Sequence, residues 1–256
     1  MARAPSGLRG RWRLPARRAG GFSLIELAVV LVIAGAILVI GSRTLFWTSE
    51  AQSLRKARVA MEDTARAVVA FSRTHHRLPC PAVPGLAPGD PGFGLEDCNN
   101  GNPGEVPHRT LLLEGPAIDT SHRPLVYALY RNALANADLG VRLNRFDGID
   151  EPQSVINVYD FCTALRNAPV SAGTGFASTS TDFTGGGCSG NAFMNQAFVL
   201  VSAGLADASG SGSPFDGNNE ANPDMCFASP EQGRSADYDD QVVAVSFTTL
   251  LGAVCP

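Results

Sequence analysis

Six oxygen-bearing side chains near the C-terminal end of the chain have the chemistry of cation ligands. They are Asp207, Asp216, Asn218, Asp237, Asp239 and Asp240. Hard cations such as Ca²⁺ take six to eight oxygens from carboxylates, amides and carbonyls of adjacent loops. The spacing is not that of an EF-hand, because Asn218 stands where a loop starting at Asp207 would need its closing glutamate. Two interpretations therefore remain open: a calcium site, or a set of solvated acidic loops.

Patterns of catalytic residues are absent from the sequence. It contains no G-x-S-x-G, no H-E-x-x-H and no P-loop motif. Ser211 and Ser213 stand among glycines, which is typical of a flexible turn. His75 and His76 lie beside the end of a predicted helix and are interpreted as polar helix-terminal residues. We therefore expect no catalytic residue and no enzyme activity.

Six cysteines are scattered through the C-terminal three quarters of the chain, and none forms a C-x-x-C pair. They are Cys80, Cys98, Cys162, Cys188, Cys226 and Cys255. An even number of dispersed cysteines is typical of disulfides in an oxidising compartment, whereas buried free thiols in a cytosolic domain are the alternative. Six cysteines allow about 15 pairings. The simplest hypothesis pairs neighbours along the chain: Cys80 with Cys98, Cys162 with Cys188, and Cys226 with Cys255.

Charge is distributed unevenly along the sequence. Residues 1–21 contain six arginines and no acidic residue. Removing these six from the 20 basic residues leaves 14 basic against 24 acidic side chains in the remainder. A protein surface this acidic repels a phosphate backbone, so we expect no nucleic acid among the partners. The same acidity favours solubility outside the cell.

An apolar segment follows the arginines directly. From Phe22 to Gly41 only Ser23 and Glu26 are polar, and about 20 such residues suffice for a helix that spans a bilayer. The preceding arginines predict a cytoplasmic N-terminus. A secretory signal peptide is the alternative, but residues 41–52 offer no small-residue cleavage site. The sequence therefore predicts a retained transmembrane helix over residues 22–41.

The helical pattern continues beyond this segment. Apolar or small residues recur at spacings of three and four, at Leu54, Ala57, Met61, Ala65, Val68 and Phe71. No proline interrupts residues 22–78, and Pro79 predicts the end of the helix. Residues 42–78 are therefore predicted to be an amphipathic continuation of the helix, which needs a surface to pack on.

Residues 79–256 are rich in turn-forming residues and are predicted to form a globular head. Five segments have the composition of short strands: Arg109–Leu113, Pro124–Tyr130, Ser154–Tyr159, Ala197–Ser202 and Gln241–Thr249. Segments 82–107, 171–192 and 204–236 are predicted to be long loops. Strands that follow one long helix favour an α+β fold, in which the helix packs on a mostly antiparallel sheet.

The run Gly21-Phe22-Ser23-Leu24-Ile25-Glu26-Leu27 resembles the cleavage and methylation motif of type IV prepilins and type II secretion pseudopilins. A glycine ends a basic leader, an aromatic residue opens the apolar segment, and a single acid follows four residues later. The resemblance implies that a prepilin peptidase cuts after Gly21 and methylates Phe22. Residues 1–21 would then be a cleaved leader, and the fold would be pilin-like.

The position of Glu26 within the apolar segment needs a physical explanation. A carboxylate in a transmembrane helix costs about 2.5–3.5 kcal/mol on insertion scales, so it is usually paired or functional. Cleavage would make the amine of Phe22 a cation with a reference pKa of about 7.7–8.0. Attraction between this amine and Glu26 strengthens where water is scarce. Pairing between chains could thereby set the axial step of a filament, so Glu26 is predicted to be an assembly contact.

The resemblance implies a structural subunit of a type II secretion pseudopilus or a type IV pilus-like filament. Its expected partners are prepilin peptidase, other pilin or pseudopilin subunits through the N-terminal helix, and an inner-membrane assembly platform. The expected location is the bacterial inner membrane, in a single pass with a periplasmic head, or a filament that reaches the cell surface. Two alternatives stay open: a minor pilin whose head binds a surface or macromolecule, and a membrane-tethered periplasmic enzyme.

A second resemblance concerns the head. Val201-Ser202-Ala203-Gly204, followed by Asp207 and by Asp237-Tyr238-Asp239-Asp240, resembles the loop in which major pseudopilins bind calcium. Calcium is therefore the one cofactor that the sequence suggests.

Overall fold

The computed structural model describes most of the chain beyond the predicted leader. The described residues are 23–99, 103–119, 121–132, 136–145, 156–170, 177–181, 188, 193–220 and 225–256, with the side chains of 39–49 left aside. The predicted processing residues Gly21 and Phe22 lie outside them. The chain divides into two compact units, Met1–Thr48 and Ser49–Pro256. The predicted domain boundaries after residues 21, 41 and 78 stay predictions.

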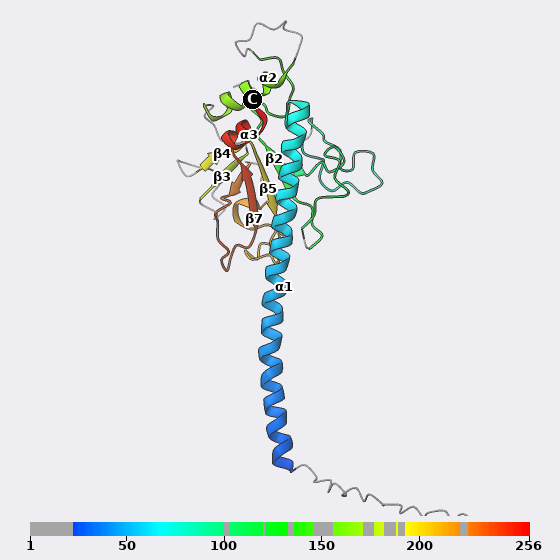
Figure 1. The fold of residues 1–256 in the computed structure, drawn as a ribbon, viewed down its shortest axis with the longest axis vertical. Coiled ribbons are helices and arrows are strands. Elements are labelled where there is room, and N and C mark those ends of the chain that lie inside the picture. The colour runs from blue at the N-terminus through cyan, green and yellow to red at the C-terminus, as the bar shows by residue number, and fades with distance from the viewer. Residues whose placement is uncertain are drawn as a thin grey trace, which may run out of the picture. The chain divides into compact units, whose positions relative to one another are not determined.

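Helix α1 (Leu24–His75) is the first of the described elements (Figure 1). Its N-terminal turn is capped locally, because the backbone N–H of Ser23 donates to Glu26 Oε2 at 3.0 Å. At its C-terminal end His76 takes a φ of 54°, the left-handed conformation that commonly terminates helices. Pro79 follows three residues later, as the sequence predicted.

Within residues 49–256, one face of α1 packs into the main hydrophobic core. Met61, Ala65, Val68 and Phe71 are buried there with the large side chains of the sheet. Spacings of three and four place these residues on one side of the helix. The helical periodicity therefore predicted which residues of this segment pack.

The sheet of the main core has four antiparallel strands in the order β1-β2-β5-β7. They are β1 (Gly104–Glu105), β2 (Val126–Leu129), β5 (Phe198–Ser202) and β7 (Gln241–Val245). Strand β5 is central and entirely buried, and it pairs with β2 and β7 along its length. The buried run of β5 matches its continuous apolar sequence, as expected for a strand covered on both faces.

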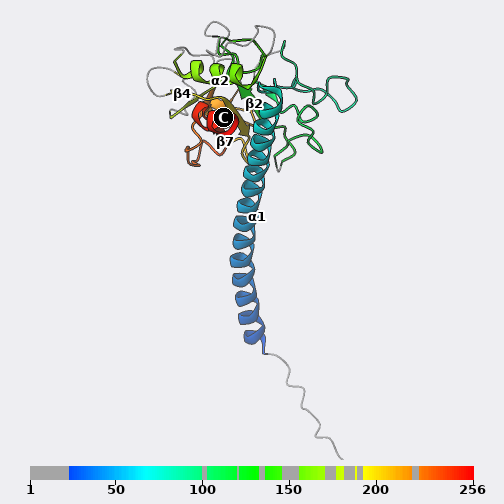
Figure 2. The same cartoon turned by 45° about the horizontal axis from the view of Figure 1, so that its top comes forward.

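The described residues of the head also form a second, smaller sheet and two short helices. The sheet has the order β4-β3-β6, with β4 (Phe193–Asn195), β3 (Ser178–Ser180) and β6 (Cys226–Ala228), and its β3–β6 pair is parallel. The helices are α2 (Val158–Asn167) and α3 (Phe247–Val254), with 3₁₀ turns η1 (Ala168–Val170) and η2 (Gly217–Asn219). Helices α2 and α3 pack together, and both views place α2 next to the C-terminal end of the chain (Figures 1 and 2).

The predicted fold class, an α+β fold with a transmembrane N-terminal helix half, is wrong. The chain is α+β, but the described residues contain no helix long and apolar enough to cross a membrane. This finding overturns the transmembrane half predicted for residues 22–41 and the single-pass inner-membrane location. The head also differs from one helix on one sheet, because it holds the second sheet with its parallel strand pair.

Two of the five predicted strands are confirmed, as β2 and β5. Residues 109–113 form turns instead of a strand, and Val158 begins helix α2 within the segment predicted as 154–159. The segment predicted as 241–249 is divided between β7 and α3, because Ser246 caps the helix by accepting from the backbone N–H of Thr249 at 3.1 Å.

All six cysteines form disulfides, in the pairs Cys80–Cys98, Cys162–Cys255 and Cys188–Cys226. The first pair was predicted, whereas Cys162–Cys188 and Cys226–Cys255 were wrong. Cys162 lies in α2 and Cys255 follows α3, so the contact between the two helices brings these residues together. Three disulfides indicate a protein of an oxidising, extracytoplasmic compartment.

Candidate functional site

The candidate site lies where strands β5 and β7 meet. Ser202, the last residue of β5, pairs with Gln241, the first residue of β7. Antiparallel pairing therefore brings the residues after β5 beside those before β7. Gly204 consequently meets Asp239 and Asp240, two residues that lie more than thirty positions away along the sequence.

Three buried carboxylates meet at this point: those of Asp216, Asp239 and Asp240. We call them the acidic cluster. Each contributes an oxygen, and these oxygens all lie within 4.8 Å of one another. The residues are 0%, 4% and 4% exposed, respectively. Asp216 comes from the loop before η2, so the cluster joins this loop to the strand edge.

Backbone N–H groups supply many of the bonds to the cluster. Asp240 Oδ1 accepts from Gly204 N at 2.9 Å, and its Oδ2 accepts from Asp216 N at 2.8 Å. Asp216 Oδ2 in turn accepts from Asp239 N at 3.0 Å, while its Oδ1 accepts from Ser209 N at 2.9 Å. The carboxylates thereby fix the path of the long loop after β5.

Asn219 adds a side-chain bond that the sequence did not predict. Its Nδ2 donates to Asp240 Oδ2 and to the hydroxyl of Tyr238, both at 3.0 Å. Its Oδ1 accepts from Ala228 N at 3.0 Å, so the same side chain ties the cluster to β6. No local sequence pattern marks this role, because the partners are separated by loops.

Among the described residues, one oxygen of the cluster has no hydrogen-bond partner. Asp239 Oδ2 accepts from the N–H groups of Leu205 and Ala206 at 2.8 and 3.2 Å, whereas Asp239 Oδ1 is buried and unpaired. The carboxylate lies against Gly204 so closely that a Cβ there would overlap Oδ1. A buried acceptor without a donor is costly, because folding removes its water and returns nothing.

The cluster also carries more negative charge than its surroundings neutralise. Within the described residues, the cation paired with it is Arg234, whose Nη2 lies 3.7 Å from Asp239 Oδ2 and which is 43% exposed. Arg234 also pairs with Glu50 at 2.7 Å. Three carboxylates that share one solvent-exposed cation favour uptake of a proton or of a further cation.

Burial changes the acidity of two members of the cluster. It raises the pKa of Asp240 to about 6, although three hydrogen bonds favour the charged form. It also raises the pKa of Asp239 above its ordinary value, and the nearby charge of Asp216 acts in the same direction. Hydrogen bonds from Leu205 and Ala206 oppose that increase. Burial therefore favours the protonated form of both carboxyls relative to exposed ones.

The structure brings three of the six predicted ligands together and leaves two apart. Asp207 is exposed, and its carboxylate accepts from the backbone N–H groups of Ser211 and Gly212 at 3.0 and 2.6 Å. Asp237 is exposed as well, two residues before Asp239 along the chain. Asn218 is buried within η2, two residues from Asp216.

A second group with metal-like spacing does not have the chemistry of a metal site. Cys80, Cys98 and Glu96 lie close together, but the two cysteines form a disulfide and offer no thiolate. Glu96 makes a bidentate ion pair with Arg77, at 2.5 and 2.6 Å, and accepts from Cys80 N at 2.9 Å. These bonds join the end of α1 to the first disulfide loop.

Glu26, the predicted assembly contact, is exposed in the first turn of α1. Its carboxylate accepts from the N–H of Ser23, as an acid near a helix N-terminus commonly does. Phe22, whose amine was predicted to pair with Glu26, lies outside the described residues. That pairing stays a prediction.

Comparison of the chain with protein-family models, with curated proteins and with solved structures found no match. The resemblance at residues 21–27 therefore stays a hypothesis from sequence.

Proposed function

We propose that the chain is a structural subunit of a type II secretion pseudopilus or type IV pilus-like filament. In this proposal prepilin peptidase removes residues 1–21 and methylates Phe22, and copies of the processed chain assemble through the N-terminal part of α1. The expected partners are therefore the peptidase, other pilin or pseudopilin subunits and an assembly platform.

The observation that carries the proposal is the exposed apolar surface at the start of α1. Leu24, Ile25, Val32 and Leu38 are 88%, 72%, 73% and 72% exposed, and the residues between them are also exposed. A continuous apolar surface of this kind is unusual on an isolated protein and is typical of an interaction site. Burying one such side chain fully contributes about 1.5–3 kcal/mol, so packing against other copies has a strong driving force.

Glu26 supports the same proposal, because it is the one acid within this exposed apolar surface. When neighbouring helices cover the surface, the carboxylate loses water and needs a cation. The new amine of Phe22 would provide it, either within one chain or from the next copy. The pairing would then select a defined axial position and disfavour others.

Two measurements test the proposal. The intact mass of the full chain isolated from its native host should correspond to a protein beginning at N-methylated Phe22. Glu26→Ala should leave processing intact and reduce polymer formation strongly, whereas Glu231→Ala, which removes an exposed acid of the head, should assemble normally. A mature chain that begins at Met1, or normal assembly of Glu26→Ala, would contradict the proposal.

We also propose that the head binds calcium at the acidic cluster. The unpaired, buried Asp239 Oδ1 favours this function, since Asp216, Asp239 and Asp240 offer carboxylate oxygens of the kind that Ca²⁺ prefers. When bound, the ion would neutralise the cluster and stabilise the loop that the carboxylates hold.

Thermal unfolding with and without Ca²⁺ tests this second proposal. At about 100 times the dissociation constant, the ion should add about 2.7 kcal/mol to the free energy of unfolding. Asp216→Asn should abolish that gain, whereas Asp237→Asn, at an exposed position, should retain it. An unchanged melting temperature in millimolar calcium would contradict calcium binding at the acidic cluster.

A further inference from the structure

Arg234 lies between the acidic cluster and helix α1. Its Nη1 is 2.7 Å from Glu50 Oε1, whereas its Nη2 is 3.7 Å from Asp239 Oδ2. The first distance is that of a charge-assisted hydrogen bond, and the second is too long for a hydrogen bond. Arg234 therefore pairs mainly with the helix and acts on the cluster through its charge alone.

Two further contacts hold this part of α1 beside the start of strand β7. Gln241 Nε2 donates to the carbonyl oxygen of Leu54, and Arg58 Nη1 donates to the carbonyl oxygen of Val242, both at 3.2 Å. Glu50, Leu54 and Arg58 follow one another at spacings of four residues, so they lie along one side of the helix. Strand β7 begins directly after the last residue of the cluster. The position of Glu50 near the cluster is thus fixed by the packing of α1 on β7.

A second arginine near the cluster has its charge paired elsewhere. Arg123 donates to the carbonyl oxygen of Gly204, but its Nε lies 2.8 Å from Oδ2 of the buried Asp119. This ion pair takes up the positive charge of Arg123. Among the described residues, Arg234 is thus the cation that pairs with the acidic cluster itself.

The arrangement leaves one oxygen of the cluster open to a further cation. Asp239 is 4% exposed, and its buried Oδ1 accepts no hydrogen bond from the described residues. Arg234 Nη2 approaches the other oxygen of the same carboxylate. A calcium ion that binds at Oδ1 would therefore act on Asp239 together with Arg234, and the two positive charges would repel each other.

We infer that Arg234 competes with calcium for the acidic cluster, and that Glu50 of α1 regulates this competition by holding Arg234 away from Asp239. The inference rests on the proposed calcium binding. A dication at the cluster weakens the attraction between Arg234 and Asp239, which leaves Glu50 as the partner of the guanidinium. Binding linkage is reciprocal, so calcium strengthens the pair of Glu50 and Arg234 by the same factor by which that pair raises the affinity for calcium. Calcium binding in the head is thereby coupled to the packing of α1.

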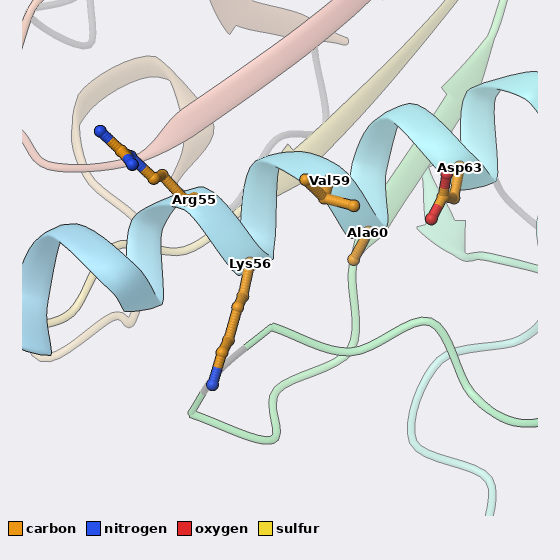
Figure 3. Close-up of a pocket in the computed structure, with 5 residues that line it drawn as sticks. All are labelled: Arg55, Lys56, Val59, Ala60 and Asp63. Atoms are coloured by element: carbon orange, nitrogen blue, oxygen red, sulfur yellow. The ribbon is translucent and has the colours of Figure 1, made fainter.

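Calorimetric titration of the full chain with CaCl₂, in a mild detergent that covers the apolar start of α1, tests the role of Arg234. Arg234→Gln should raise the affinity about threefold or more, because it removes a positive charge beside a dication. Lys56→Gln is the matched control, since this side chain is also exposed and extends away from α1 (Figure 3). Its affinity should stay within about twofold of that of the unmodified chain.

Glu50→Gln tests whether Glu50 acts through Arg234. Without Glu50 the guanidinium turns fully to Asp239, so the affinity should fall about threefold. This loss should disappear when Arg234→Gln is also present, because the competitor is then missing. A Glu50 that attracts calcium only as a distant negative charge would instead show the same loss in both backgrounds. Glu231→Gln, which removes an exposed acid from the loop that carries Arg234, should leave the affinity unchanged in either background.

Asp216→Asn identifies the heat that belongs to the cluster, because it removes one of the three carboxylates. Calcium binding that this variant abolishes, tighter binding by Arg234→Gln and a Glu50 effect that needs Arg234 together support both the inference and the calcium proposal. Unchanged or weaker binding by Arg234→Gln, or a Glu50→Gln loss that persists without Arg234, overturns the inference and leaves the calcium proposal standing. If Asp216→Asn binds calcium normally, or if neither the unmodified chain nor Arg234→Gln binds it, both are overturned.

Discussion

The two carboxylate oxygens of Asp239 have different environments. Its Oδ2 holds the chain after β5 through two backbone N–H groups, while Oδ1 faces Gly204 and accepts no hydrogen bond from the described residues. Glycine at position 204 is required sterically, because any Cβ would occupy the place of the carboxylate. The sequence predicted the residue types of this site, but the meeting of Gly204 with Asp239 depends on the register of β5 and β7.

The close approach at Gly204 gives the first prediction. Gly204→Ala should lower the free energy of unfolding by about 1–3 kcal/mol, the usual cost of overpacking, because the methyl group displaces the Asp239 carboxylate. Gly233→Ala is the matched control, since a Cβ there meets no atom within 4 Å. Denaturant unfolding of both variants measures the difference. Equal stability of the two would show that the acidic cluster can move aside freely.

The raised pKa of Asp240 gives a pH dependence with a defined sign. A carboxyl whose pKa is about 6 in the folded chain and about 4 when unfolded favours folding in its protonated form. Its contribution is therefore complete below pH 4 and is lost as pH rises through 6. Relative to Asp240→Asn, the unmodified chain without calcium should lose about 2–3 kcal/mol of stability between pH 4 and pH 7. Parallel pH profiles for both chains would contradict this expectation.

At the scale of the elements, the spacing of apolar residues predicted the features that depend on nearby residues alone. The spacing of Met61, Ala65 and Val68 predicted the packed face of α1, and the apolar runs of β2 and β5 predicted two strands. The failures have two different causes. Residues 154–159 have strand-like composition, yet Asn157 caps a helix there through a reciprocal bond with Asp160. The second sheet consists of three-residue strands, which are too short for alternation to be recognised.

Alanine substitutions on the two faces of α1 test whether only one face packs against the head. Met61→Ala should lower the free energy of unfolding by about 2–5 kcal/mol, because Met61 is fully buried in the main core. Val59→Ala, two residues earlier on the exposed face, should change it by less than about 0.5 kcal/mol. Denaturant unfolding of the two variants provides the comparison. Similar losses would mean that both faces of the helix contact the head.

At the scale of the whole molecule, the disulfides connect parts that the sequence separates. Pairing neighbours along the chain predicted Cys80–Cys98 correctly, because both residues flank one loop. It failed for Cys162, since the partner Cys255 is brought close by the packing of α2 on α3. Composition and number of cysteines indicate that disulfides form, whereas their pairing requires the tertiary fold. The same limit applies to the acidic cluster, whose members come from two loops.

The length of the loop that each disulfide closes predicts how much it contributes to the free energy of unfolding. The pair Cys162–Cys255 spans 93 residues and Cys80–Cys98 spans 18. In the chain-entropy relation, closing the longer loop contributes about 4.7 kcal/mol and closing the shorter about 3.2 kcal/mol. Replacing Cys162 and Cys255 by serine should therefore destabilise the chain by about 1.5 kcal/mol more than replacing Cys80 and Cys98. Denaturant unfolding of the two double variants, after non-reducing peptide mapping has verified the remaining pairs, measures this difference.

A larger loss of stability from replacing Cys80 and Cys98 would show that the shorter cross-link does more than close a loop. The Glu96 contact with Arg77 and Cys80 N, which joins that loop to α1, is the structural feature that would then account for it.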